Sequence, residues 1–326
     1  MKNTRLFSLL LILVTMLLAA CTGGKPSANE KLHVLATTSM VADVVRQVGG
    51  EYVQVTTLLP LGTDPHTFEP RPQDVAAIED AQIVFANGAG LEEFLEPLLK
   101  SAGAMDKLVE VSQGIELLPL EGIEHSHEHE EEEHSHEGEE HSHEGGMHHH
   151  QGGDPHTWMD PNNVLIWVEN IATALAKADP RHAKVYRAHA EAYANELRAL
   201  DAWIREQVAQ VPPENRVLVA DHAVFGYFAE EYGFRQLGTI THSFSTGASP
   251  SAQELAALED QIRTYGVKAI FVGADVNQNL AKQIAADTGV RIVQLYHGSL
   301  TDAQGPAPTY LDFMRYNVTA IVEALK

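Results

Sequence analysis

Two separate parts of the chain alternate short apolar runs with longer amphipathic stretches. In the first part the predicted strands are 32–36, 53–59, 81–86 and 108–111, and the predicted helices are 40–48, 72–79 and 91–100. In the second part the predicted strands are 216–220, 236–241, 268–272 and 291–296, and the predicted helices are 222–232, 252–265, 277–288 and 308–325. Such alternation produces a parallel sheet with helices on both faces. The sequence therefore predicts an α/β fold with two lobes, each with a parallel sheet flanked by helices.

One long helical pattern separates the two parts. Asp179 is expected to cap this helix, and Pro180 suits its first position. Its apolar residues recur at three- and four-residue spacing: Tyr186, Ala190, Tyr193, Leu197, Leu200, Ile204 and Val208. Residues 180–208 would span about 43 Å, and no glycine interrupts them. We therefore expect one long rigid α-helix to join the lobes.

The first twenty residues have the composition of an export signal. Lys2 and Arg5 precede an unbroken run of apolar or small residues from Leu6 to Ala20, which is too short for an ordinary transmembrane helix. The run ends at Cys21, the only cysteine of the chain, in the order typical of a bacterial lipobox. We therefore expect cleavage before Cys21 and lipidation of this residue. A signal peptide followed by a coincidental cysteine is the alternative.

Acidic residues dominate the composition and restrict the partners of the chain. Asp and Glu number 45 against 22 Lys and Arg, so the formal net charge is −23. We expect no binding to nucleic acid, because phosphates are neutralised by Lys and Arg. Residues 121–154 contain 11 Glu, one Asp and ten of the 18 histidines, but neither Lys nor Arg. Much of the excess charge is therefore confined to one segment.

The histidines of this segment lie in a stretch that cannot fold alone, because Met147 is the only apolar residue between positions 125 and 150. We interpret 121–153 as a disordered His-rich loop of the first lobe that binds metal weakly and exchangeably. A solvated acidic loop without a specific role and an engineered tag are the alternatives. The internal and extended His–Glu pattern disfavours a tag.

Three histidines outside that loop are candidate metal ligands. His66 and His156 each follow an Asp-Pro pair, and His222 follows the predicted strand 216–220. A nearby carboxylate can accept a hydrogen bond from the imidazole nitrogen that does not bind the metal. Ligands of parallel sheets bind outside the carboxyl ends of the strands, so we expect these histidines to form a site between the lobes. Their separation excludes a local zinc finger.

Two aromatic residues near the candidate ligands and four further histidines are also interpreted from the sequence. The aromatic residue two positions later, Phe68 or Trp158, could shield the site from water. We interpret four other histidines as structural residues: His33, His182, His189 and His242.

The chain resembles the metal-binding lipoproteins of bacterial zinc and manganese ABC importers, the ZnuA/TroA-like family. The segments that carry the resemblance are 62–95, 154–163, 220–233, 250–272 and 309–325. It implies two α/β lobes joined by a rigid helix, a metal held in the cleft, and delivery to a membrane permease. It also places His66, His156 and His222 at the first three ligand positions of the family.

The same resemblance bears on the choice of metal. Manganese members often have Glu at the third position, where this chain has His222. Three imidazoles favour Zn(2+) over the harder Mn(2+), so Zn(2+) is the expected transported ligand and Mn(2+) the alternative. Gly298 stands where many members have an acidic fourth ligand. His297, Asp302 or a water molecule could take that place.

These inferences divide the chain into a lipoprotein signal peptide (1–20), a tether (21–31), an N-terminal α/β lobe (32–179), a linking helix (180–210) and a C-terminal α/β lobe (211–326). We expect a monomeric, extracytoplasmic lipoprotein, anchored through Cys21, that delivers Zn(2+) to a permease. A zinc-buffering or adhesin-type surface lipoprotein is the first alternative. A zinc hydrolase is the second, but no nucleophile elbow, phosphate loop or acid–base pair accompanies these histidines in the sequence. We therefore expect that the chain is not an enzyme.

Overall fold

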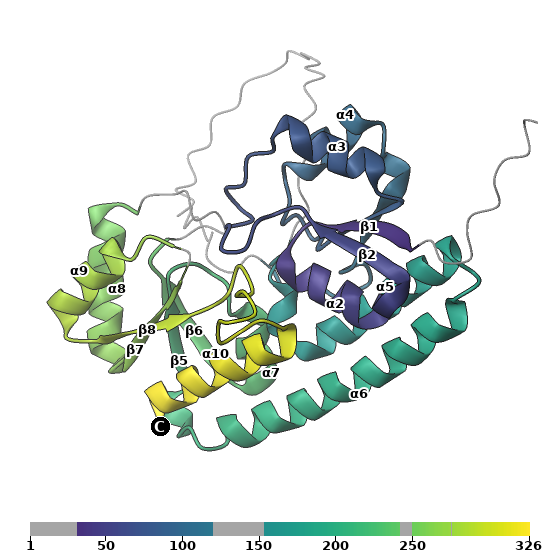
Figure 1. Ribbon diagram of the computed structural model, residues 1–326. Helices are drawn as coiled ribbons and strands as arrows, with labels where there is room; N and C mark the ends of the chain where they lie inside the picture. The colour runs from purple at the N-terminus through teal and green to yellow at the C-terminus, as the bar shows by residue number, and fades with distance from the viewer. Residues whose placement is uncertain (1–30, 120–152, 242–249, 275) are drawn as a thin grey trace, which may run out of the picture.

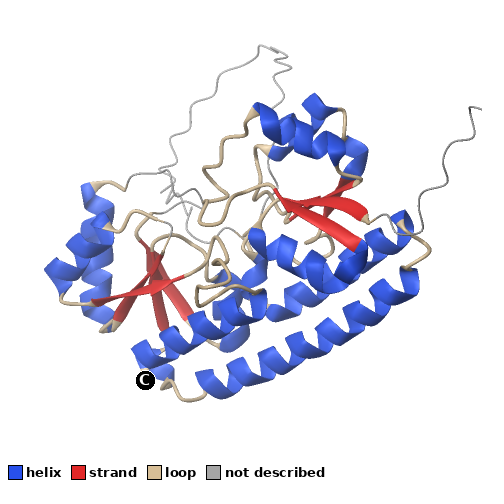
Figure 2. Ribbon diagram, in the orientation of Figure 1, coloured by secondary structure: helices blue, strands red, loops and turns tan. Residues whose placement is uncertain are grey.

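The computed structural model describes residues 31–119, 153–241, 250–274 and 276–326. The signal peptide, Cys21, nearly all of the tether, the His-rich loop and His242 therefore lie outside the described residues. The described chain forms two lobes, each built on a four-stranded parallel sheet with helices on both faces (Figures 1 and 2). The predicted fold class is confirmed.

The N-terminal sheet has the strand order β2-β1-β3-β4. Its strands are β1 (Leu32–Ala36), β2 (Val53–Thr57), β3 (Ile83–Ala86) and β4 (Leu108–Glu110). Helices α3 (Pro72–Asp80) and α4 (Leu95–Ala102) cover one face, while α2 (Ser39–Gly49) and α5 (Pro161–Ala178) cover the other. Because successive strand residues point to opposite faces, Leu35 packs beneath α3 and α4, and Val34 packs beneath α2.

The C-terminal sheet repeats this arrangement with the order β6-β5-β7-β8. Its strands are β5 (Val217–Ala220), β6 (Arg235–Thr239), β7 (Ala269–Gly273) and β8 (Arg291–Leu295). The helices of this lobe are α7 (Gly226–Tyr232), α8 (Ala252–Tyr265), α9 (Asn279–Thr288) and α10 (Tyr310–Leu325). In both lobes the carboxyl ends of the strands lead into the loops that carry the candidate histidines.

Two long antiparallel helices support both lobes. Helix α6 (Ala183–Val208) is the predicted linking helix, and α5 packs along it over much of its length. We did not predict α5, although Asp160 caps it and Pro161 begins it, which is a recognisable start signal. The remaining elements are single 3₁₀ turns: η2 (Gly50–Tyr52), η3 (Met105–Lys107), η4 (Thr157–Met159) and η5 (Pro213–Asn215).

The predicted start of the linking helix was wrong. Helix α6 begins at Ala183, after His182, and Asp179 instead follows the last residue of α5. The Asp179 carboxylate accepts hydrogen bonds from Arg181 Nε (3.1 Å), His182 Nδ1 (2.6 Å) and the Tyr186 hydroxyl (3.2 Å). The carboxylate therefore closes the turn between the two helices instead of capping α6.

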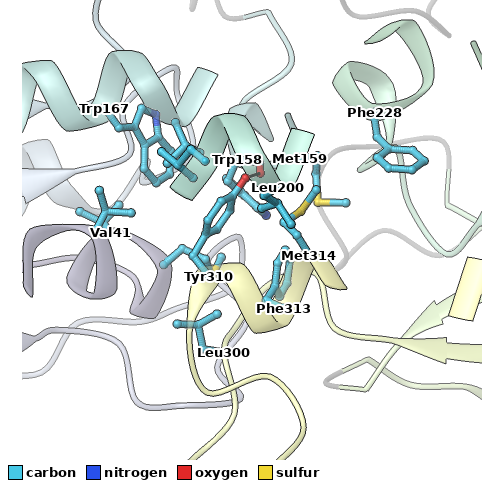
Figure 3. Packing of buried hydrophobic residues seen from close by; sticks show 14 of the residues in the cluster. Val41, Trp158, Met159, Trp167, Leu200, Phe228, Leu300, Tyr310, Phe313 and Met314 are labelled. Carbon is cyan, nitrogen blue, oxygen red and sulfur yellow. Dashed lines mark hydrogen bonds between the residues drawn. The ribbon is translucent and has the colours of Figure 1, made fainter. Parts of the chain in front are cut away.

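One continuous apolar core joins the lobes. Figure 3 shows Trp158 and Leu200 packed against Tyr310, Phe313 and Met314 of α10. The Tyr310 hydroxyl donates to the carbonyl oxygen of Trp158 (2.7 Å). The apolar face of α6 is buried against α5 and α2 of one lobe and against α10 of the other. The two lobes are thus fixed to the same helix and to each other.

We predict only a small change in shape when metal binds. Hinge motion requires a few residues that absorb a large backbone change, but α6 is unbroken and buries seven residues along its length. Polar contacts between lobes reinforce it, since the Leu300 amide donates to Ser39 Oγ and the Tyr310 amide donates to Asp43 (2.9 Å each). Small-angle scattering should give nearly equal radii of gyration with and without Zn(2+). A clear contraction on loading would contradict a rigid linker.

None of the helices among the described residues combines the length and the apolar character needed to cross a membrane.

Candidate metal centre

The structure brings the three predicted histidines together between the lobes. His66 lies in the loop after β2, His156 lies just before η4, and His222 lies two residues after β5. One nitrogen from each imidazole lies within 4.8 Å of the other two, and the Nε2 atoms of His66 and His156 are 3.1 Å apart. Each residue belongs to a loop whose position is set by a buried strand or helix, so the site is assembled by the fold.

These imidazoles line a small cavity of about 10 Å³, which is large enough for one particle of the size of a water molecule. The other residues that line it are Asp64, Pro65, Trp158, Val276, His297 and Gly298. His156 and His222 are almost completely buried, with exposed fractions of 0% and 3%. A cavity of this size with three converging imidazoles suits a single metal ion.

Carboxylates orient two of the three rings. His156 Nδ1 donates to Asp154 Oδ1 (2.7 Å), and His222 Nδ1 donates to Asp221 Oδ2 (3.1 Å). In this tautomer, assigned from the hydrogen bonds, the Nε2 atoms keep the lone pairs that a metal requires. Asp64 and Asp154 each accept a hydrogen bond from the backbone amide of the histidine two residues later, His66 or His156 (2.9 Å each). The sequence pattern predicted a nearby carboxylate partner for His66 and His156 without choosing the residue, and it did not single out Asp221.

Burial favours the neutral form of two of the three candidate imidazoles. It lowers the pKa of His66 to about 3, with a further contribution from His156 and His222. Burial also lowers the pKa of His156 well below its ordinary value, and the nearby His222 and His297 rings act in the same direction. Conversely, burial raises the pKa of Asp154 to about 7. The two imidazoles are therefore neutral, as metal binding requires, over a wide pH range.

We predict that Asp154 releases a proton when metal binds at pH 6. With a pKa of about 7, this carboxyl is mostly protonated at pH 6, and a bound dication favours its ionised form. His66 and His156 should already be neutral, whereas two imidazoles of ordinary pKa would release roughly 1.5 protons. Calorimetry in buffers of different ionisation enthalpy should show about one proton fewer for Asp154→Asn than for the wild type. Equal release by the two proteins would contradict this assignment.

The two aromatic residues proposed as shields behave differently. Trp158 lines the cavity, with its ring centroid 5.2 Å from that of His156. Phe68 instead packs against Phe94 (4.9 Å) in the core under α3 and α4. The expectation for Phe68 was therefore wrong, because an apolar surface of its own lobe is closer than the cavity.

The structure also distinguishes between the two side chains that we considered as a fourth ligand. His297 lines the cavity and is buried, with an exposed fraction of 2%. Asp302 is exposed, and its carboxylate accepts hydrogen bonds from the amides of Gln304 (3.0 Å) and Gly305 (2.9 Å). Asp302 therefore stabilises a surface turn away from the cavity.

A buried carboxyl that we did not predict supports the loop of His156. Glu92 accepts hydrogen bonds from Thr37 Oγ1 (2.6 Å) and from the amides of Asn87 (2.8 Å) and Gly88 (3.0 Å). The Asn87 side chain in turn donates to the carbonyl oxygen of Pro155 (3.0 Å). Burial raises the pKa of Glu92 to about 7. Helix α4 begins at Leu95, four residues after the start that we predicted at residue 91.

The histidines interpreted as structural lie away from the cavity. His182 stacks on Tyr52 (4.1 Å between centroids), and His189 Nδ1 donates to the carbonyl oxygen of Val48 (3.1 Å). His33 is exposed on β1.

Two α/β lobes joined by a rigid helix, with a histidine-lined metal cavity between them, define the solute-binding proteins of metal importers. The chain belongs to the ZnuA family, described as zinc-uptake complex component A, periplasmic, which matches residues 34–324. Among curated relatives, the manganese-binding lipoprotein MntA of Halalkalibacterium halodurans is 32% identical over 98% of both chains. The iron-binding protein YfeA of Yersinia pestis is 29% identical over 99% of this chain and 96% of its own length.

Solved structures agree with this assignment. The periplasmic zinc-binding protein TroA from Treponema pallidum superposes with a TM-score of 0.75 at 26% identity, covering 91% of this chain and 99% of TroA. The Mn-bound periplasmic metal-binding protein from Candidatus Liberibacter asiaticus gives a TM-score of 0.74 at 28% identity, covering 91% of this chain and all of that chain. The chain is thus an extracytoplasmic, membrane-anchored metal-binding component of an ABC importer, and it is not an enzyme.

Proposed function

We propose that this protein captures Zn(2+) with His66, His156 and His222 and delivers it to the permease of its importer. The observation that carries this proposal is the convergence of three imidazoles on one small cavity, with two of the rings oriented by carboxylates. Such a preformed site binds without ordering a flexible chain, which favours high affinity.

The donor set supports zinc rather than manganese. Imidazole suits Zn(2+), whereas Mn(2+) prefers carboxylate and carbonyl oxygen. The carboxylates of Asp154 and Asp221 accept hydrogen bonds from imidazole nitrogens. Relatives are named for manganese, iron and zinc, so membership of the family leaves the metal open.

Metal analysis of protein purified without added metal tests this choice. We expect about one tightly held Zn per protein, and we expect excess Mn(2+) to leave it in place. Replacement of the bound zinc by equimolar Mn(2+) would contradict the proposal.

The proposal also assigns roles to Cys21, the tether and the His-rich segment, which lie outside the described residues. Cleavage before Cys21 and lipidation of that residue would anchor the protein, and the polar residues up to position 31 would form a tether. The His-rich segment 121–153 would raise the local concentration of metal near the cleft. We further propose that the protein acts as a monomer with its permease.

The His-rich segment also favours a second candidate function, which is zinc buffering at the cell surface. Its ten histidines offer several weak sites that a transport protein does not need. Co-purification of a permease with the membrane-anchored protein would support transport, whereas its repeated absence would support buffering.

We predict that deleting residues 125–150 leaves one tight zinc site and removes several weaker ones. Metal binding within this polar, highly charged segment must order the chain, and that entropy cost lowers its affinity. Calorimetric titration of the deletion variant and the full chain measures both classes of site. If the tight site disappears and the weak ones remain, the segment itself is the main binding element.

A further inference from the structure

We propose that Tyr227 is a positioning residue of the metal centre, which holds Asp154 in place and, through Asp154, the ring of His156. Tyr227 lies on α7 of the C-terminal lobe, whereas Asp154 and His156 lie just before η4 of the N-terminal lobe. This inference rests on the proposed function, because it concerns the same site. It makes one half of the centre depend on a hydroxyl group of the other lobe.

The Tyr227 hydroxyl joins two backbone groups of the N-terminal lobe. It donates to the carbonyl oxygen of Asp154 (2.8 Å) and accepts a hydrogen bond from the amide of Leu118 (3.3 Å). The side chain is buried, and burial raises the pKa of Tyr227 to about 12, so the hydroxyl keeps the proton that it donates. Buried backbone groups need such partners. Tyr227 therefore fixes the position of both segments.

Asp154 is enclosed by the segments that this hydroxyl joins. Its own amide donates to the carbonyl oxygen of Leu118 (2.8 Å). Gly226, which precedes Tyr227, approaches Asp154 so closely that a Cβ atom at this position would collide with Asp154 Oδ2. The start of α7 thus lies against both the backbone and the carboxylate of Asp154.

The carboxylate held in this way is the one that orients His156. Asp154 Oδ1 accepts hydrogen bonds from the backbone amide of His156 (2.9 Å) and from its Nδ1 (2.7 Å). A carboxylate in this place sets the tautomer and the direction of a metal-binding ring. A shift of Asp154 would therefore reach the ring of His156. Removal of the Tyr227 hydroxyl should weaken the site although every candidate donor remains in the chain.

Tyr232, on the same helix, provides a matched control. Tyr227 and Tyr232 have the same exposed fraction, 5%. The Tyr232 hydroxyl also donates to an aspartate, because it lies 2.9 Å from Asp201 Oδ1. Asp201, however, lies on α6 and pairs with Arg205 (3.0 Å) instead of with a candidate ligand. Loss of either hydroxyl should destabilise the fold similarly, but only the loss at Tyr227 should affect the metal.

The test compares Tyr227→Phe and Tyr232→Phe with the wild type as full chains. Chelator competition measures zinc affinity, chemical denaturation measures the stability of the metal-free protein, and the visible spectrum of bound Co(2+) reports the geometry of the site. We expect Tyr227→Phe to bind zinc roughly 3- to 10-fold more weakly, below the effect of losing the orienting carboxylate itself. We also expect an altered Co(2+) spectrum. Tyr232→Phe should match the wild type in affinity and in spectrum.

A double variant tests whether Tyr227 acts through Asp154. In the Asp154→Asn background, Tyr227→Phe should cost much less affinity than in the wild type, because the carboxylate that it positions is already absent. Zinc loading stabilises the folded state. If metal-free Tyr227→Phe does not fold, the rate of zinc dissociation from the loaded variant replaces the affinity, and a similar acceleration is expected.

Three results would overturn the proposal. Unchanged zinc binding and Co(2+) spectrum in Tyr227→Phe would exclude a positioning role, and an equal loss of affinity in Tyr232→Phe would indicate a general loosening of α7. Fully additive losses in the double variant would exclude the route through Asp154. His66→Ala tests the proposed function separately, because it should lose the tight zinc site whatever Tyr227 does.

Discussion

Replacing His66, His156 and His222 with Ala is expected to abolish tight zinc binding while the protein remains folded. The three rings are the donors that converge on the cavity, and the loss of all three leaves at most His297 beside it. The apolar clusters of both lobes contain none of these residues, so the core should persist. Any one replacement alone should weaken binding strongly, because each removes a donor that no nearby side chain can replace in position.

Competition with a chelator of known affinity measures this effect, and circular dichroism establishes that each variant is folded. His33→Ala serves as the control, since His33 is an exposed histidine of β1 that does not line the cavity. A triple variant that still holds one equivalent of zinc as tightly as the wild type would show that the site lies elsewhere, with the His-rich segment as the first candidate.

Much of the fold could be predicted because the inner strands of both sheets are short apolar runs that are almost entirely buried. The predicted β1 matches the observed strand, and β3 is buried at all four positions. The predicted helix starts were wrong where a turn takes the place of the expected first helical turn. Residues 222–225 form a turn before α7 instead of its first turn, and Asp179 closes a turn that the sequence presents as a cap. Local pattern alone does not distinguish these alternatives.

Some residues of the candidate site could also be predicted from the sequence, and others could not. His66 and His156 could be found because a repeated Asp-Pro-His pattern is local, and His222 because it ends a predicted strand. The role of Glu92 and the pairing of Asp221 with His297 depend on contacts between distant segments, as does the bond of Asn87 to Pro155. Residues that support a site from another loop carry no signal in a single sequence.

Replacing Cys21 with Ala is expected to release the protein from the membrane. The sequence offers a positive amino terminus, an apolar run and Cys21 in the order of a lipobox, and lipidation requires the thiol. Acyl chains contribute about 0.8 kcal/mol per buried methylene group, so their loss removes the main attraction to lipid. Electrostatic attraction cannot compensate, because the net charge of −23 opposes binding to anionic lipid.

Detergent partitioning and fractionation of cells expressing the two proteins measure this change. The wild type should enter the detergent phase and sediment with membranes, whereas Cys21→Ala should remain in the aqueous phase. Zinc binding by the purified variant should equal that of the wild type, because the residues that line the cavity lie between Asp64 and Gly298 and the tether lies outside this range. Cells that depend on this importer should then grow poorly at scarce zinc despite an intact site. Unchanged partitioning of the variant would show that Cys21 is a coincidental cysteine and that another feature holds the protein at the membrane.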